Sequence, residues 1–155
     1  MMEQLKLTVN DDKTHLCQIP QERFDFLGYT FGRCYNQQTG RAYIGTRPSS
    51  KSIKRMVESI TQETDRGRIL LDGEDVVGRL NRKLIGWANY FCLGPVRPAY
   101  RAINAHVTQR LRRWLCKKHK VPGNGWARYP NQYLHEQLGL VNLPARIRDL
   151  PWAKA

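Results

Sequence analysis

Hydrophobic positions recur at two different spacings along this chain, and the change between them divides it. Residues 23–47 are rich in aromatic and β-branched side chains, and the polar run NQQTG at 36–40 separates two short extended segments. This pattern predicts a β-hairpin. After Pro48 the apolar residues instead recur every three or four positions, which is the spacing of amphipathic helices.

The first predicted helix runs from about Lys51 to Glu63, and Ser49 or Ser50 can cap its first turn. Its apolar side consists of Ile53, Met56, Val57 and Ile60.

A second helix follows the break DRGRILLDGED and stops at Gly94 and Pro95. Its start is favoured by three acidic residues, Asp72, Glu74 and Asp75, since carboxylates stabilise the positive end of a helix. Its apolar side consists of Val76, Val77, Leu80, Leu84, Trp87, Ala88 and Phe91.

A third helix ends near the segment KHKVPGNG at 118–125. Its apolar side consists of Tyr100, Ile103, Val107, Leu111, Trp114 and Leu115. A weaker fourth helix is predicted at 131–140, before a proline-punctuated tail that can pack or stay loose. The expected fold class is therefore α+β and mostly α: an N-terminal β-hairpin and a bundle of three to four helices, with a domain boundary that divides 1–48 from 49–155.

Positive charge is concentrated in the helical part. Residues 1–48 hold six of the 26 Lys and Arg and five of the 13 Asp and Glu, whereas residues 49–155 hold twenty and eight. Nine basic and no acidic residues lie from Arg97 to Arg128, and six of the nine are Arg. Because uncompensated cations repel one another, the formal net charge of +13 favours a polyanionic partner over a purely solvated surface.

Nothing in the sequence predicts a membrane span, a secretory signal or a metal site. The apolar runs fall short of the roughly 18 to 20 residues needed to cross a bilayer, and the start MMEQLKLTVN lacks an uninterrupted apolar core, so a cytoplasmic location is expected. The four cysteines are widely spaced, which fits a reducing compartment. Cys116 and His119 have the spacing of half a zinc site, but no second half is evident.

The basic side chains of the second and third helices and of the following loop are the candidate contacts with a polyanion. They are Arg79, Arg82, Lys83, Arg97, Arg101, Arg110, Arg112, Arg113, Lys117, Lys118, Lys120 and Arg128. On the third helix, Arg110, Arg113, Lys117 and Lys120 fall near one face, beside the apolar rows, so that the helix can pack inward and contact phosphates outward.

Four aromatic residues are candidates for stacking on bases, and each also fits a structural role: Tyr90, Tyr100, Trp126 and Tyr129. The segment GNGWARYP at 123–130 is the best loop candidate, because it combines glycine, charge and two aromatic rings.

The stretch LNRKLIGWANYF at 80–91 places its large apolar residues along one side of the second helix. Core packing is the simpler interpretation of Trp87. Gly86 is unusual, because glycine inside a helix costs about 0.5–1 kcal/mol relative to alanine, and close approach of another backbone usually offsets that cost. Either a neighbouring helix or a phosphate backbone is expected to approach Gly86.

Four ordered segments resemble one protein family. LNRKLIGWANYF is similar to the signature of the group II intron maturase-specific domain, and LRRWLCKKHK at 111–120 resembles that domain's second basic-aromatic block. LKLTVNDDKTHL at 5–16 and FDFLGYTF at 24–31 resemble the last two conserved blocks of a group II intron reverse transcriptase palm. The resemblance implies that 1–48 is the end of a palm and that 49–155 is the thumb and maturase domain.

The resemblance also implies partners. Group II intron RNA is the expected ligand, and the protein holds it in its active fold while the RNA performs splicing. In the parent enzyme the thumb clamps a template-primer duplex, and Lys51, Lys54 and Arg55 are the residues here that match that role. Gly28 would then lie near the primer end, although an ordinary hairpin glycine is an equal alternative.

Polymerase chemistry is not expected from this chain. The Tyr-Ala-Asp-Asp box that holds magnesium in the family should precede LKLTVN, and no such box occurs. Asp11 and Asp12 match the later block instead. The tail also lacks the clustered His, Asn and Cys-x-x-Cys features of the family's DNA-endonuclease module. No catalytic residue, cofactor or metal is therefore assigned, and magnesium belongs only to a full-length parent enzyme.

Four interpretations remain open. The first is an RNA-binding maturase piece, and the second is a subunit or truncated remnant that needs a separate catalytic palm. The others are a decayed mobile-element fragment and a general basic DNA-binding protein.

Overall fold

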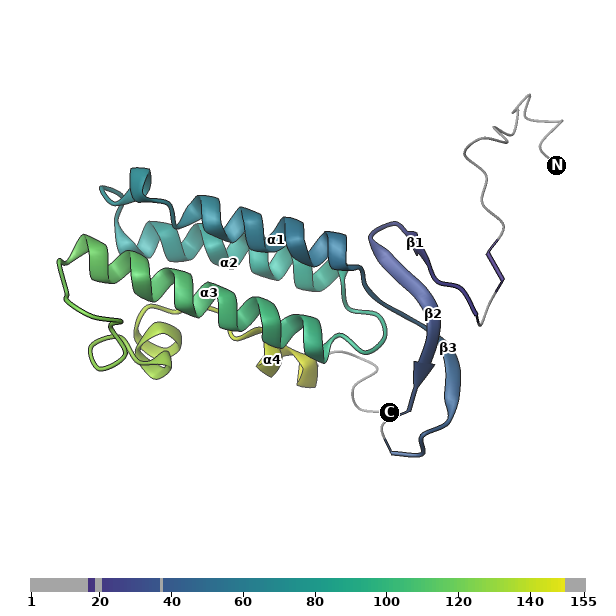
Figure 1. Cartoon of the computed structure of the whole chain (residues 1–155). Coiled ribbons are helices and arrows are strands. Elements are labelled where there is room, and N and C mark those ends of the chain that lie inside the picture. Colours follow the sequence, from purple (N-terminus) through teal and green to yellow (C-terminus); the bar gives the residue numbers. More distant parts are fainter. Residues whose placement is uncertain (1–16, 19–20, 37, 150–155) are drawn as a thin grey trace, which may run out of the picture.

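Three long helices lie side by side, and a small antiparallel sheet stands at one end of them (Figure 1). A computed structural model describes residues 17–18, 21–36 and 38–149. Within that part of the chain the predicted fold class is confirmed. Three strands at the N-terminal side form a sheet, and the rest of the fold is mostly helical.

The sheet contains the predicted hairpin and one additional strand. Strands β2 (Tyr29–Tyr35) and β3 (Ala42–Pro48) pair antiparallel, with Tyr29 opposite Pro48 and Tyr35 opposite Ala42. The Asn36 side chain organises the turn, because its Oδ1 accepts hydrogen bonds from the backbone N–H groups of Gln38 (2.8 Å) and Thr39 (3.0 Å). The additional strand, β1 (Phe24–Phe26), pairs with the start of β2 across a tight turn.

The first two helices begin where the sequence predicts. Helix α1 (Ser50–Glu63) is capped by Ser49, whose Oγ accepts from the Ser52 N–H at 3.2 Å. Helix α2 (Gly73–Tyr90) is capped by Asp72, with two further carboxylates in its first turn. A 3₁₀ turn, η3 (Arg66–Arg68), connects them.

Helix α3 (Arg97–Lys118) runs antiparallel to α2 and completes the core (Figure 1). The three helices bury one continuous apolar cluster that also receives residues from the C-terminal segment. Its fully buried members include Ile60, Val76, Leu80, Leu84, Tyr100, Ile103, Val107, Leu111, Leu134 and Leu143. Each large side chain of this kind contributes about 1.5–3 kcal/mol on burial.

The predicted fourth helix is wrong in type and length. Residues 131–140 contain a single π-helical turn, η4 (Tyr133–Gln137), in which the Leu138 N–H donates to the Tyr133 carbonyl at 3.1 Å. Gly139 follows with φ +70°, a left-handed backbone that ends the turn. The tail then packs on the bundle as α4 (Leu143–Arg146) and the 3₁₀ turn η5 (Ile147–Asp149).

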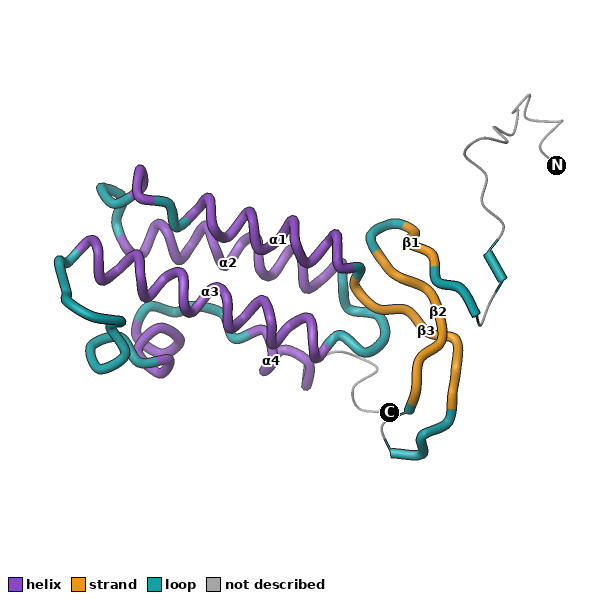
Figure 2. The backbone as a smooth tube through the Cα atoms, in the orientation of Figure 1, coloured by secondary structure: helices purple, strands orange, loops and turns teal. Residues whose placement is uncertain are grey.

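The sheet is joined to the end of the bundle where α1 and α3 begin and α2 ends (Figure 2). The Gly28 carbonyl accepts from the Ser49 N–H at 2.9 Å and from Ser52 Oγ at 3.0 Å. Tyr29 OH donates to the Tyr90 carbonyl at 2.5 Å, and Tyr90 OH donates to the Leu27 carbonyl at 2.9 Å. Ser49 alone separates the end of β3 from the start of α1, and the predicted division into two domains between Pro48 and Ser49 stays a prediction.

Among the helices of the described residues, none is both long enough and apolar enough to span a membrane.

Candidate nucleic-acid interface

The side of α3 that faces away from the core carries a row of cations. Arg97, Arg101, Arg113 and Lys117 are exposed there, separated by short or neutral side chains. The two ion pairs that the structure records among the described residues both involve Glu63 on α1. Neither pair includes a residue of this cationic face of α3, which is available to an external anion.

One end of the cationic face opens into a groove between α3 and the C-terminal end of α1. We call it the end groove; its volume is about 210 Å³. Its lining comprises Thr64, Asp65, Arg66, Ile69, Arg110, Arg113, Trp114 and Lys117. Four of these eight side chains are basic and one is acidic, so the end groove is an electropositive cleft.

Arg110 lies at the base of the end groove and is held there by α1. Its Nε donates to Thr64 Oγ1 at 3.1 Å, and its Nη2 donates to the carbonyls of Thr61 (3.2 Å) and Thr64 (3.3 Å). The acceptors are neutral, so these bonds fix the guanidinium without cancelling its charge. Arg110 is half-buried, and its fixed guanidinium holds a positive charge at the end groove.

Two titratable groups report that field. Backbone hydrogen bonds from Gly67 and Arg66 lower the pKa of Asp65, and the nearby charges of Arg110 and Lys117 lower it further. Burial lowers the pKa of His106, and the positive charge of Arg110 adds to that effect. A nearby positive charge stabilises the ionised form of Asp65 and the neutral form of His106, so it lowers both pKa values.

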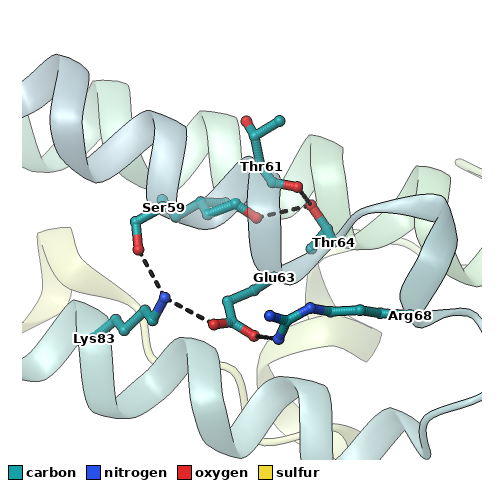
Figure 3. Close-up of polar contacts among 7 residues, drawn as sticks. Ser59, Thr61, Glu63, Thr64, Arg68 and Lys83 are labelled. Carbon is teal, nitrogen blue, oxygen red and sulfur yellow. Dashed lines mark hydrogen bonds and ion pairs between the residues drawn. The ribbon is translucent and has the colours of Figure 1, made fainter.

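Lys83, one of the predicted RNA contacts, is engaged inside the protein. Its Nζ lies 2.7 Å from Glu63 Oε1 and donates to Ser59 Oγ at 2.8 Å, which joins α2 to α1 (Figure 3). Arg68 pairs with the other oxygen of Glu63 (Figure 3). Although burial of Glu63 opposes ionisation, the hydrogen bond and charge of Lys83 outweigh it, and the net pKa of Glu63 lies below its usual range.

Arg112 and Lys118 were predicted to be exposed contacts, but the structure shows both side chains bonded inside the protein. Arg112 is only 2% exposed, because its side chain points under the loop that follows α3. Lys118 Nζ donates to the carbonyls of Ile69 (3.1 Å) and Leu71 (2.7 Å), which ties α3 to the α1–α2 connection. Helical periodicity places both residues beside the apolar side of α3 but does not show the segments that cover them.

Of the four aromatic side chains predicted to stack on bases, two are buried and two are exposed. Tyr100 and Tyr129 are buried, and the Tyr100 hydroxyl donates to the carbonyls of Ala88 (2.9 Å) and Phe91 (3.1 Å). The prediction of base stacking is therefore wrong for these two rings. Tyr90 and Trp126 are each 54% exposed and stay candidates.

With this geometry established, a comparison with protein-family models finds a match over residues 52–133 to the group II intron, maturase-specific domain. The match covers more than half of the chain, from the first turn of α1 to the start of η4. The chain belongs to this family. Membership implies an RNA-binding role related to group II intron maturases and reverse transcriptases. A search of the curated proteins found no match.

In this maturase-specific domain, much of the LNRKLIGWANYF motif builds the fold. The Trp87 ring lies 4.7 Å from Phe91 and 5.9 Å from Tyr100, centroid to centroid, at the edge of the core. Core packing of Trp87 is thus confirmed. The closing Tyr90 and Phe91 hold the sheet, through the hydrogen bonds already described and through ring contacts with Tyr29.

Gly28 of the segment FDFLGYTF and Gly86 of LNRKLIGWANYF have different surroundings. Gly28 has φ +83°, and a Cβ there would lie 2.8 Å from Phe91 Cζ, so its close approach is to the ring of Phe91, directly after α2. Gly86 is exposed, with no described atom within 4 Å of an added Cβ, apart from its own helix and chain neighbours. Of the two partners predicted for Gly86, a neighbouring helix is excluded within the described chain.

The maturase-specific domain exposes the other predicted basic contacts without assigning them a ligand. Arg79, Arg82, Lys120 and Arg128 are exposed, as are the predicted template-primer residues Lys51, Lys54 and Arg55 on the first turns of α1. Their contacts with nucleic acid stay predictions.

No group of three or more His, Cys, Asp or Glu side chains that could hold a metal ion occurs within the described residues. Cys116 is buried under Gly125, and its predicted half-site partner His119 instead lies near the Tyr129 ring. The palm-like segment 5–16, with Asp11 and Asp12, lies outside the described residues.

Sequence reasoning missed two residues, one at the end groove and one that holds the C-terminal segment. Arg66 lines the end groove because Asp65 Oδ2 accepts from the Gly67 N–H at 3.2 Å and closes a tight turn. The Asp-Arg-Gly order could have indicated that turn. Asn81, the second motif residue, binds the C-terminal segment on both sides of Leu140. No local pattern predicts such a distant partner.

Proposed function

We propose that this protein binds folded group II intron RNA and holds it in its splicing-competent fold, while the RNA performs the transesterification. The observation that carries the proposal is the cationic face of α3, whose exposed arginines and lysine take part in neither of the ion pairs recorded among the described residues. A protein that binds one RNA fold more tightly than the others shifts the population toward it.

The proposed contacts are with phosphates and ribose hydroxyls rather than with paired bases. A-form RNA hides its base edges in a deep, narrow groove, so a protein reads shape, backbone and exposed loops. Arg101 and Arg113 suit the backbone, because a guanidinium can bind a phosphate through two parallel hydrogen bonds. Arg110 in the end groove is already oriented by Thr64, which lowers the entropy cost of engaging a phosphate.

Filter binding tests the proposal. The purified chain is titrated against a folded transcript of the group II intron nearest to its gene, and against a transcript of equal length and shuffled sequence, over a series of salt concentrations. We expect tighter binding to the intron at every salt concentration. Equal affinity for both RNAs throughout would favour a general basic binding protein and would contradict the proposal.

A pair of variants separates the cationic face from general charge. Arg113→Gln is expected to weaken intron binding about tenfold and to reduce the slope of log affinity against log salt by about one. Arg41→Gln removes an exposed charge of the same kind near the β2–β3 turn and is expected to change affinity by less than about twofold.

A second candidate function is that of a subunit that completes a polymerase with a separate catalytic palm. Exposed apolar side chains on the sheet favour it, since clustered exposed hydrophobic residues mark protein contacts. They are Phe26, Leu27, Tyr35, Tyr43 and Ile44.

In either case we propose that the chain has no polymerase activity of its own. Primer extension by the purified chain is expected to give no product above background. Synthesis by the chain alone would refute this part of the proposal.

A further inference from the structure

A second groove lies on the other flank of α3, between that helix and the loop that precedes η4. Its volume is about 420 Å³, within the range of small-ligand pockets. Its lining includes Arg101, Ala105 and Gln109 from α3, with Trp126 and Asn131 from the loop. We call it the tryptophan groove, because the half-exposed Trp126 ring is its largest flat surface.

A buried cation forms the back of the tryptophan groove. The Arg112 Nε donates to the Tyr129 carbonyl at 2.8 Å, and its Nη2 donates to Asn131 Oδ1 at 2.5 Å. Both acceptors are neutral, and Arg112 makes no ion pair within the described part of the chain. Burying a charge without a counter-charge is costly, so this guanidinium favours electron-rich neighbours.

Trp126 is such a neighbour. The Arg112 Cζ lies 3.7 Å from the centre of the Trp126 ring, which is a close cation–π contact. The loop is also fixed at the preceding residues: Trp126 N–H donates to Asn124 Oδ1 at 3.2 Å, and Gly125, with φ +74°, packs against Arg112 and Cys116. The ring is therefore held on a guanidinium while 54% of the residue stays exposed.

We infer that the tryptophan groove binds an unpaired nucleobase of the intron RNA, stacked on the exposed side of Trp126. An aromatic ring fixed in advance loses little entropy when a second flat ring stacks on it. Exposed Arg101 at the groove is placed to meet the adjoining phosphate, and the Gln109 amide offers a donor and an acceptor to a base edge. This inference rests on the proposed function and adds a recognition element to it, because the cationic face alone cannot separate single strands from duplexes.

Fluorescence anisotropy with labelled RNA tests the inference. The probes are a short single-stranded RNA and an RNA duplex of the same length, and the protein is the full chain. Trp126→Ala is expected to weaken single-strand binding about tenfold, whereas Trp126→Phe keeps it within about threefold, because a phenyl ring still stacks. Neither substitution is expected to change duplex binding by more than about twofold.

A matched control comes from the sheet, where Arg33 lies over the exposed Tyr35 ring at 5.4 Å. Tyr35→Ala removes an exposed, arginine-backed ring outside the tryptophan groove and is expected to leave both probes unaffected. Unchanged single-strand binding in Trp126→Ala would overturn the inference, and so would an equal loss in Trp126→Ala and Tyr35→Ala. A thermal melt confirms that the variants fold. Binding of the intron transcript by Trp126→Ala, with selectivity over shuffled RNA intact, would leave the proposed function standing.

Discussion

At the scale of single residues, the buried carboxylate of Glu63 decides how the bundle responds to acid. Although burial opposes ionisation, Lys83 and Arg68 hold the net pKa of Glu63 below the usual value of 4.5. A lowered pKa means that the folded state binds the proton less well than the unfolded state does. The resulting stability is present above the unfolded pKa and is lost as the pH falls through the folded pKa.

Glu63→Gln tests this account by equilibrium urea unfolding. At neutral pH we expect the variant to lose about 2 kcal/mol of unfolding free energy, because two cations lose their shared partner; both are partly exposed, so the loss is smaller than for a fully buried pair. As the pH falls through the lowered pKa of folded Glu63, the difference from the wild type should shrink, since the wild-type carboxyl then becomes protonated too. A difference that does not depend on pH would contradict an electrostatic origin.

Histidine protonation acts in a separate pH window. Burial lowers the pKa of His106, so stability falls as the pH drops below the unfolded value near 6.5 and protonation favours the unfolded chain. This loss is common to the wild type and Glu63→Gln and cancels in their difference. The comparison therefore isolates the carboxylate.

At the scale of elements, the predictions succeeded where one helix or hairpin carries its own signal. The capping serine, the acidic start of α2 and the three-and-four spacing of its apolar residues are local, and the structure confirms each. Residues 131–140 carry a similar spacing but form only a π-helical turn, because Leu134 and Leu140 are buried by contacts with distant helices. Arg112 failed as an exposed contact for the same reason, since a loop distant in sequence covers it.

Asn81 shows how distant elements are fixed. Its Nδ2 donates to the Gly139 carbonyl at 2.8 Å, and its Oδ1 accepts from the Val141 N–H at 2.9 Å, so one amide on α2 holds both sides of the buried Leu140. Asn81→Ala removes both bonds: water can replace the one to the exposed Gly139 carbonyl, but the partly buried Val141 N–H loses its partner. We expect a loss of about 1–3 kcal/mol in unfolding free energy and faster amide hydrogen exchange at Val141.

Asn89→Ala is the matched control for this prediction. Asn89 also lies on α2 and contacts the C-terminal segment, but through one exposed hydrogen bond of 3.3 Å from Arg146. Its loss should cost less than about 0.5 kcal/mol. Equal losses in both variants would show that the two bonds of Asn81 do not hold the segment.

At the scale of the whole molecule, charge repulsion opposes folding while it favours RNA binding. The net charge is +13, and three of the nine basic residues from Arg97 to Arg128 are bonded internally: Arg110, Arg112 and Lys118. The other six are exposed around α3 and the following loop. The internal bonds could not be predicted from charge spacing, because their acceptors are backbone and side-chain oxygens on other elements.

Salt should therefore act in opposite directions on stability and on binding. Ions screen the repulsion among exposed cations, so the melting temperature is expected to rise by about 2–4 °C between low and moderate salt, which corresponds to about 1 kcal/mol for a chain of this size. RNA affinity should fall over the same range, because salt competes with the phosphate contacts. Thermal melts and filter binding in the same buffers measure both trends. A melting temperature that falls with salt would mean that ion pairs outweigh repulsion in this fold, and the cationic face would then be less free for RNA than the geometry indicates.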